Sequence, residues 1–208
     1  EHQDVTGELV YIEYPFAEGE GGIEVATTRA ETMLGDTAVA VHPDDERYRG
    51  IIGRTLRLPL VGREIPVIGD AVVDPAFGTG AVKVTPAHDP TDFEIASRVG
   101  PPATTVLDED GVITAAGGQF AGLDRFDARA AVKEALAEAG VLRRIEAYSH
   151  AVGHCYRCGT MVEPYFSEQW FVRVRPLVEP ALAAVRDGEV NFVPRRWEKH
   201  YTLWMENL

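Results

Sequence analysis

The chain has 208 residues, of which 45% are hydrophobic and 25% are charged. This balance excludes a disordered tail and predicts a folded protein with a buried core. No apolar run approaches the length of about 18 residues that a membrane helix requires, so we expect no membrane span. The net charge of −13 argues against binding of long nucleic acid through the overall field, so any nucleic-acid contact should be local.

The N-terminal sequence EHQDVTGELV lacks the basic and apolar regions of a secretory signal, and we therefore expect a cytoplasmic protein. The chain contains two cysteines, which is too few for a disulfide framework.

Short strands dominate the first part of the chain. Residues 7–14 and 23–28 are rich in β-branched and aromatic side chains, flank the stretch AEGEGG, and predict a β-hairpin. Further short strands, separated by Gly, Pro and Asp, are predicted at 37–42, 55–60, 65–68 and 79–85. Helical patterns cover 90–99, 127–139 and 176–187. These elements predict a mixed α/β fold with a bent or barrel-like β core flanked by helices.

The composition changes after about residue 148, where His, Cys, Trp and Arg become more frequent and the predicted short strands stop. We therefore predict a core domain at 1–148 and a connecting segment at 149–208.

The stretch TTRAET at 27–32 follows a predicted strand. Thr28 and Glu31 fit the T-x-x-E spacing of a capping box, in which two side chains satisfy the free N–H groups at the start of a helix. The spacing alone favours this structural interpretation. A capping box does not explain Arg29. Its guanidinium, with five N–H donors, lies just after the end of a predicted strand and beside several hydroxyl groups. Arg29 is therefore a candidate binding residue.

The stretch FGTGAVKVTPAHDPTD at 77–92 contains a strand with two different faces. Strand alternation places Lys83 and Thr85 on one face and Val82 and Val84 on the other. The valines can enter the core, while Lys83 and Thr85 face solvent or a cavity.

A helix start follows this strand directly. Asp89 suits the N-cap position, Pro90 suits N1 and Asp92 falls at N3. Capping and the helix dipole already explain both carboxylates without any function. However, N-cap and N3 side chains converge on the end of the helix, where His88 also lies, close to the end of the Lys83 strand. This convergence of polar side chains indicates a functional site at the start of the helix.

Other chemistries lack their usual motifs. Ser97, Ser149 and Ser167 do not lie in G-x-S-x-G, and H-E-x-x-H, Walker A and G-x-G-x-x-G motifs are absent from the sequence. Serine hydrolase, zincin, nucleotide kinase and dinucleotide-binding functions therefore lose their usual support.

Cys155 and Cys158 form a C-x-x-C motif followed by Gly159. Such a knuckle presents two thiolates to zinc, whereas a structural zinc takes four ligands. His150 and His154 could complete a Cys₂His₂ set, although His154 adjoins Cys155 and is poorly spaced to share its metal. A redox pair is disfavoured, because no thioredoxin-like βαβ pattern surrounds the cysteines.

Three segments resemble, in this order, the inserted editing region of bacterial valyl-tRNA synthetases: TTRAETMLGDTAVAVHPDDERY, GTGAVKVTPAHDPTDFE and HCYRCGTMVEPYFSEQWFV. The resemblance extends over almost the whole chain. Isoleucyl and leucyl enzymes carry the first two segments in altered form, so Arg29, Lys83 and the HDPTD ending favour the valyl type. Ala30 departs from the family, which usually has proline there, and RVGPPATT at 98–105 is more Pro-rich than expected.

The resemblance implies hydrolysis of the ester that joins a wrongly attached amino acid, chiefly threonine, to the 3′ end of the valine tRNA. Threonine is nearly isosteric with valine, so an apolar pocket rejects it weakly and a second, polar pocket must recognise its hydroxyl. By resemblance, the residues of this second pocket are Thr27, Arg29, Thr32, Lys83, Thr85, His88, Asp89 and Asp92.

The candidate catalytic residues among them are Asp92, Asp89 and Lys83. Asp92 is expected to bind the α-ammonium group, and Asp89 and Thr85 the side-chain hydroxyl. Arg29 and Lys83 suit the terminal ribose and phosphate, or the carbonyl oxygen as negative charge develops on it. None of these groups is a convincing nucleophile, so we expect attack by a positioned water. The alternative is a module that positions the tRNA 3′ end without hydrolysing anything.

The resemblance also implies a larger context. The signature sequences of an aminoacylating core are absent, so we expect a fragment of a larger synthetase. Its partners would be the threonine-carrying 3′ end of the valine tRNA and the remainder of the same synthetase. Editing would need no cofactor. Cys155 and Cys158 would be half of a structural zinc site of the full-length enzyme, empty in this fragment.

Overall fold

The computed structural model describes residues 1–100 and 102–208. They form two compact units, Glu1–Phe166 and Ser167–Leu208. The boundary predicted near residue 148 falls within a strand of the first unit, Leu142–Gly153. The functional division into 1–148 and 149–208 stays a prediction.

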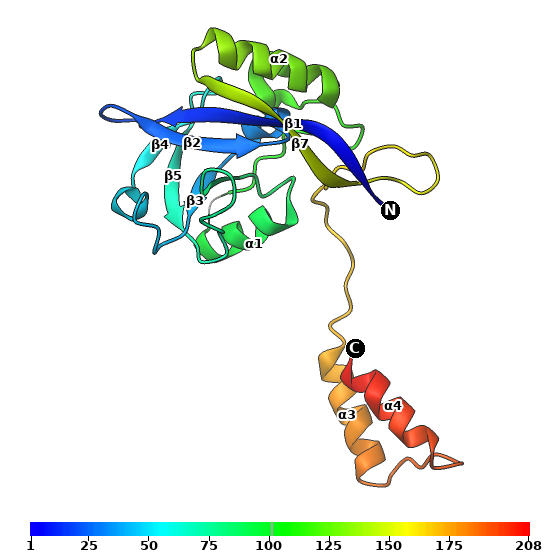
Figure 1. Cartoon of the computed structure of the whole chain (residues 1–208). Coiled ribbons are helices and arrows are strands. Elements are labelled where there is room, and N and C mark those ends of the chain that lie inside the picture. The colour runs from blue at the N-terminus through cyan, green and yellow to red at the C-terminus, as the bar shows by residue number, and fades with distance from the viewer. Residues whose placement is uncertain (101) are drawn as a thin grey trace. The chain divides into compact units, whose positions relative to one another are not determined.

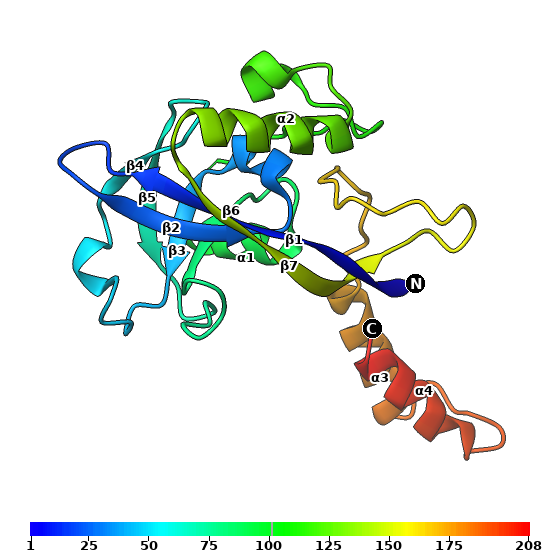
Figure 2. The ribbon, with the colours of Figure 1, turned by 45° about the horizontal axis from the view of Figure 1, so that its top comes forward.

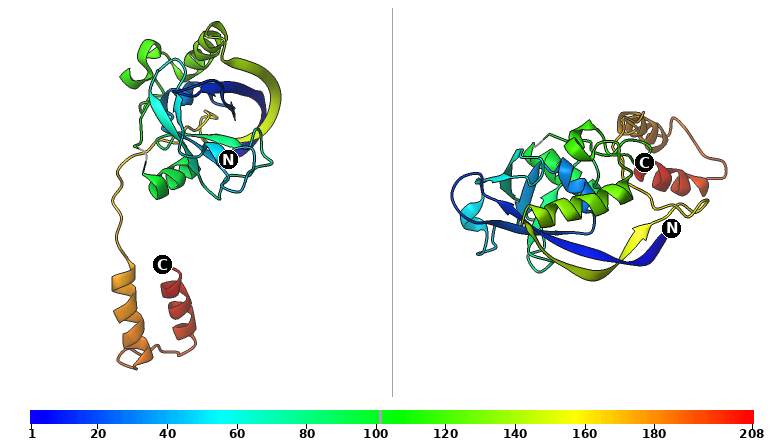
Figure 3. Two further views of the ribbon diagram at one scale, coloured as in Figure 1. Left: turned by 90° about the vertical axis from the view of Figure 1, so that its left-hand side faces the viewer. Right: turned by 90° about the horizontal axis from the view of Figure 1, so that it is seen from above.

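The first sheet of the larger unit has three antiparallel strands in the order β2-β1-β7 (Figure 1). The strands are β1 (His2–Pro15), β2 (Gly22–Thr27) and β7 (Leu142–Gly153). The predicted hairpin is thus confirmed. β1 and β7 pair over most of their length and bend together, as the left view of Figure 3 shows. The sequence did not predict β7, because most of its side chains are exposed and give no clear apolar alternation.

The second sheet has four short strands in the order β4-β5-β3-β6. They are β3 (Ala38–Val41), β4 (Thr55–Arg57), β5 (Glu64–Gly69) and β6 (Ala81–Val84). β3 runs parallel to β5 and antiparallel to β6, and β4 runs antiparallel to β5. The predicted mixed α/β fold of short strands and flanking helices is confirmed. In the part of the chain that the structure describes, both sheets are open and no barrel closes.

The four-stranded sheet is apolar on both faces. Val39 and Val41 of β3 join the main core together with side chains from both sheets. Ala38 and Ala40 point to the other face, where Ile95 of α1 (Pro90–Val99) covers them. This two-residue alternation packs α1 against the sheet that carries β6.

Helix α2 (Arg125–Glu138) closes the main core with Ala128, Val132 and Leu136, which recur every four residues on one face. Figure 2 shows α2 beside the three-stranded sheet. The remaining helices of this unit are the short 3₁₀ segments η1 (Ala30–Gly35), η2 (Arg49–Ile51) and η3 (Ala115–Phe120).

The smaller unit contains α3 (Arg175–Arg186) and α4 (Trp197–Glu206), which pack against each other. Val178, Leu182 and Val185 of α3 are buried, and an Arg186–Glu206 ion pair of 2.7 Å links the two helices. Within the described residues, every helix is too short or too polar to cross a membrane.

Candidate functional site

A pocket of about 330 Å³ opens between the two sheets and the start of α1. Its volume is at the small end of the range for ligand pockets. All eight residues that the resemblance assigned to the pocket line it: Thr27, Arg29, Thr32, Lys83, Thr85, His88, Asp89 and Asp92. Leu9, Tyr148 and His150 from β1 and β7 also line the pocket, and sequence reasoning missed them as pocket residues. The remaining wall residues are Ala26, Thr28, Phe77 and Val82.

The start of α1 places the two carboxylates as the sequence predicts. Asp89 is the N-cap, and its Oδ1 accepts the N–H groups of Thr91 at 2.8 Å and Asp92 at 3.0 Å. Asp92 Oδ2 accepts the backbone N–H of Thr85 at 2.8 Å. Asp92 thereby joins the first turn of α1 to the end of β6, which explains why the helix end and the Lys83 strand meet.

Burial changes the acidity of Asp92. Asp92 is 6% exposed, and this burial raises the pKa of its carboxyl from 3.8 to about 6. The Lys83 ammonium and the Thr85 N–H favour the ionised form but do not cancel the effect of burial. Asp92 is therefore largely ionised at neutral pH and becomes protonated near pH 6.

This pKa predicts how stability depends on pH. A carboxyl with a raised pKa in the folded state stabilises the fold at low pH, and this contribution is lost as pH rises towards about 6. In Asp92→Asn the group does not titrate, so the unfolding free energy of the variant relative to wild type should rise between pH 4 and 7 by on the order of 1–3 kcal/mol. Urea unfolding at both pH values measures this. A constant difference would contradict the prediction.

Lys83 and Thr85 line the pocket and continue into a chain of polar contacts beneath it. The Lys83 ammonium donates to Thr85 Oγ1 at 2.6 Å, and the Thr85 hydroxyl donates to Asp36 Oδ1 at 2.6 Å. Tyr14 donates to Asp36 Oδ2, also at 2.6 Å. Sequence reasoning missed Asp36. Its position directly before the predicted strand TAVAV is a detectable signal of a buried carboxylate.

The capping box predicted at Thr28 and Glu31 is wrong. The segment forms the 3₁₀ helix η1, whose start has Arg29 at the N-cap and no side-chain cap. Glu31 is fully buried and instead receives two hydrogen bonds of 2.7 Å from Arg129 of α2. The capping box fails because a bidentate tertiary ion pair takes the carboxylate away from the backbone.

The neighbouring hydroxyls hold the backbone of Arg29 in place. Thr27 Oγ1 accepts the N–H of Arg29 at 3.0 Å, and the Thr32 hydroxyl donates to its carbonyl at 3.0 Å. The Arg29 guanidinium donates through Nη1 to the carbonyl of His88 at 3.0 Å and forms an ion pair through Nη2 with Glu163. Arg29 is thus fixed at the pocket by three segments, of which the one around Glu163 was not predicted.

His88 lines the pocket with a ring that is already engaged. Nε2 accepts the N–H groups of Val106 at 2.9 Å and Leu107 at 3.2 Å, and the residue is 1% exposed. Burial, followed by the charge of Arg29, lowers the pKa of His88 to about 4. A neutral imidazole that accepts two backbone hydrogen bonds orders residues 106–107 and does not act as an acid near pH 7.

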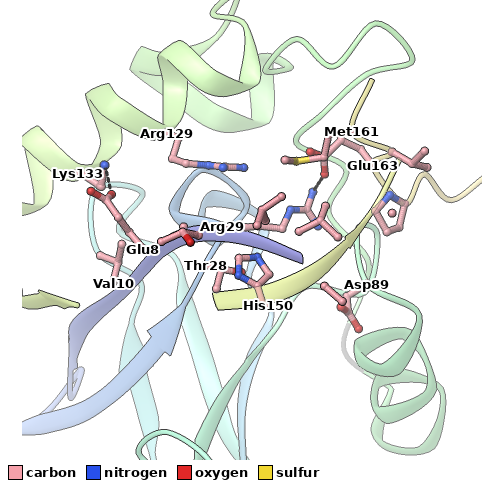
Figure 4. A pocket seen from close by; sticks show the side chains of 18 residues that line it. Glu8, Val10, Thr28, Arg29, Asp89, Arg129, Lys133, His150, Met161 and Glu163 are labelled. Carbon is pink, nitrogen blue, oxygen red and sulfur yellow. Dashed lines mark hydrogen bonds and ion pairs between the residues drawn. The ribbon is translucent and has the colours of Figure 1, made fainter. Parts of the chain in front are cut away.

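A larger pocket of about 600 Å³ adjoins the first and shares Thr28, Arg29, Asp89 and His150 with it. Figure 4 shows this second pocket, with Arg29 and Glu163 on its wall and the Lys133–Glu8 ion pair nearby. On its wall, Arg29 pairs with Glu163 and Lys133 pairs with Glu8, whereas Arg129 pairs with the buried Glu31 outside the pocket.

The C-x-x-C motif forms a tight turn. His154 and Met161 form a β-bridge, and the N–H of Cys155 donates to the carbonyl of Thr160 at 2.8 Å. Hydrogen bonding between Cys158 and Thr160 lowers the pKa of the Cys158 thiol. Across residues 1–100 and 102–208, no three His, Cys, Asp or Glu side chains gather as metal ligands. That Cys155 and Cys158 are half of a structural zinc site stays a prediction.

We expect the purified chain to hold zinc only weakly, because two thiolates are half of the required tetrahedral set. Metal analysis after dialysis, with thiol titration, measures this. Stoichiometric and tightly held zinc would contradict the prediction and would point to His150 or His154 as further ligands.

Comparison with known proteins agrees with the fold and the motifs. A family model for tRNA synthetases class I (I, L, M and V) matches residues 2–208. The valine--tRNA ligase of Anoxybacillus flavithermus is 57% identical over 208 residues, which are 100% of this chain and 24% of that protein. The chain thus spans about a quarter of the length of this relative.

Two crystal structures share the fold. One is the ternary LeuRS–tRNA–LeuAMS complex of Agrobacterium radiobacter K84, with a TM-score of 0.50 and 20% identity over 77% of this chain and 24% of that chain. The other is GlLeuRS-CP1, with a TM-score of 0.55 and 14% identity over 68% of this chain and 99% of that chain. These two structures show the fold alone, whereas the family model matches nearly the whole sequence. The chain therefore belongs to the class I tRNA synthetases of the I, L, M and V group.

Proposed function

We propose that this chain hydrolyses the ester between threonine and the 3′-terminal ribose of a mischarged valine tRNA. The observation that carries the proposal is the gathering of eight polar residues, from two separate segments of the chain, around one pocket of about 330 Å³. A pocket lined by buried polar groups favours an amino acid whose side chain can pair with them, and threonine differs from valine in this respect.

Asp92 and Asp89 are proposed to bind the amino acid. The Asp92 carboxylate is largely ionised at neutral pH and suits the α-ammonium group of the ester. Asp89 uses Oδ1 to cap α1, and its other oxygen is proposed to accept the proton of the side-chain hydroxyl jointly with Thr85, in a three-centre hydrogen bond.

Lys83 is proposed to stabilise the reaction's negative charge. Water adds to the ester carbonyl, the carbonyl oxygen gains negative charge beside the Lys83 ammonium, and the ribose oxygen then leaves with a proton. The products are threonine and a tRNA with a free terminal hydroxyl. Orientation and electrostatics would supply most of the rate, because the proposed pocket offers no convincing nucleophile.

The partners and the setting belong to the same proposal. A relative of this chain is named valine--tRNA ligase, and a structure of the same fold was solved with tRNA. These names support the 3′ end of the valine tRNA and the rest of a synthetase as partners. Cytoplasmic location, cofactor-independent editing and the editing role of residues 1–148 are further parts of the proposal.

The test is release of labelled threonine from threonyl-tRNA with the valine anticodon, by this chain or by the synthetase that contains it. We expect release well above the rate of spontaneous hydrolysis. A tRNA that is bound with its ester intact would indicate the alternative, a module that only positions the 3′ end.

A further inference from the structure

Asp36 lies directly beneath the proposed pocket without lining it. The residue follows η1, precedes β3 and is 0% exposed. Both carboxylate oxygens accept short hydrogen bonds of 2.6 Å, Oδ1 from Thr85 and Oδ2 from Tyr14. The Lys83 ammonium is 3.6 Å from Oδ1. The proposed reaction does not use this buried charge, so its presence needs another explanation.

The donors and acceptors in this cluster can be assigned from their chemistry. An ionised carboxylate only accepts hydrogen bonds, an ammonium group only donates, and a hydroxyl has one proton and two lone pairs. Thr85 therefore gives its proton to Asp36 and accepts from Lys83 on one lone pair. The hydroxyl of Thr85 has one acceptor position left, and Thr85 lines the pocket.

The surroundings of Asp36 have opposing effects on the pKa of its carboxyl. Burial raises the pKa of Asp36, while the Lys83 ammonium and the hydroxyls of Thr85 and Tyr14 favour the ionised form. The two hydroxyl donors and the nearby ammonium are the partners that a charged carboxylate requires when it is buried.

We propose that Asp36 is a positioning residue that sets the specificity of the pocket: it holds the Thr85 hydroxyl as a hydrogen-bond acceptor, so that the pocket selects an amino acid ester whose side chain donates a hydrogen bond. A threonyl hydroxyl donates to Thr85, whereas the valyl methyl group leaves Thr85 unpaired. The inference rests on the function proposed above and names the group that gives this site its preference.

Asp36→Asn tests the assignment, because an amide keeps the volume and replaces one acceptor by a donor. The amide oxygen should face Tyr14, whose fully buried hydroxyl needs an acceptor, and the amide nitrogen should then face Thr85. Thr85 receives two donors in that arrangement and turns its own proton into the pocket. We expect the ratio of threonyl to valyl ester hydrolysis to fall by about tenfold or more.

Two variants provide the controls. Tyr14→Phe removes the hydrogen bond to Oδ2 and leaves the one between Asp36 and Thr85 in place, so the ratio should stay within about threefold of wild type even if the melting temperature falls. In the double variant with Asp36→Asn, the amide oxygen is free to face Thr85, and the ratio should recover towards wild type. A purely structural role for Asp36 predicts a further loss in the double variant instead.

A substrate analogue tests the same point in the wild-type protein and needs no variant to fold. In an ester of 2-amino-3-fluorobutyrate, fluorine replaces the threonine hydroxyl and can accept but not donate. We expect wild type to hydrolyse this ester as slowly as the valyl ester.

The outcomes separate the two proposals. Wild type that releases no threonine overturns the proposed function. Wild type that releases threonine but treats the fluorinated ester like the threonyl ester, or a folded Asp36→Asn that keeps the wild-type ratio, overturns the assignment of Asp36 alone.

Discussion

Replacement of Asp92 by asparagine is expected to reduce threonyl ester hydrolysis by about 100-fold or more, because the variant loses the charge proposed to bind the α-ammonium group. The amide oxygen can still accept the backbone N–H of Thr85, which Asp92 accepts at 2.8 Å in wild type. The fold should therefore survive. Single-turnover release of threonine measures the effect on the reaction, and urea unfolding measures the effect on the fold.

Asp127→Asn is the matched control for this variant. Asp127 also lies in the first turn of a helix, α2, but its side chain is exposed and lies outside the pocket. We expect wild-type hydrolysis from it. If Asp92→Asn keeps full activity, capping and the link to Thr85 are the whole role of Asp92.

Threonyl-tRNA is expected to be hydrolysed at least tenfold faster than valyl-tRNA when both amino acids are attached to the same tRNA. Valine is close to threonine in shape, so the difference arises from the polar groups that valine leaves unpaired, each of which costs about 1–3 kcal/mol when buried. Thr85 and Asp89 are the groups proposed to contact the side chain.

The measurement is the ratio of the two first-order release rates at saturating protein. A ratio near one would contradict the specificity argument while leaving hydrolysis itself intact, and would indicate an esterase that recognises the tRNA end alone. Thr85→Val offers a further check, since the ratio should fall towards one when the hydroxyl is absent.

The sequence by itself determined the local features around the site. The order Asp89, Pro90, Asp92 specifies the start of α1, because an N-cap side chain and a proline at N1 act within one turn of backbone. The hairpin of β1 and β2 is equally local, with six paired positions separated by a short glycine-rich turn. Resemblance then named eight residues, and all eight line one pocket.

The tertiary structure alone decided which partners these residues have. The Asp36 carboxylate meets Tyr14 and Thr85, which lie 22 and 49 positions away in the chain. Glu163 reaches Arg29 across 134 positions, and Glu31 pairs with Arg129 across 98 positions. Such pairs leave no periodic pattern in the sequence. They form because packing removes charged groups from water, and each buried charge then requires a partner that only the folded chain supplies.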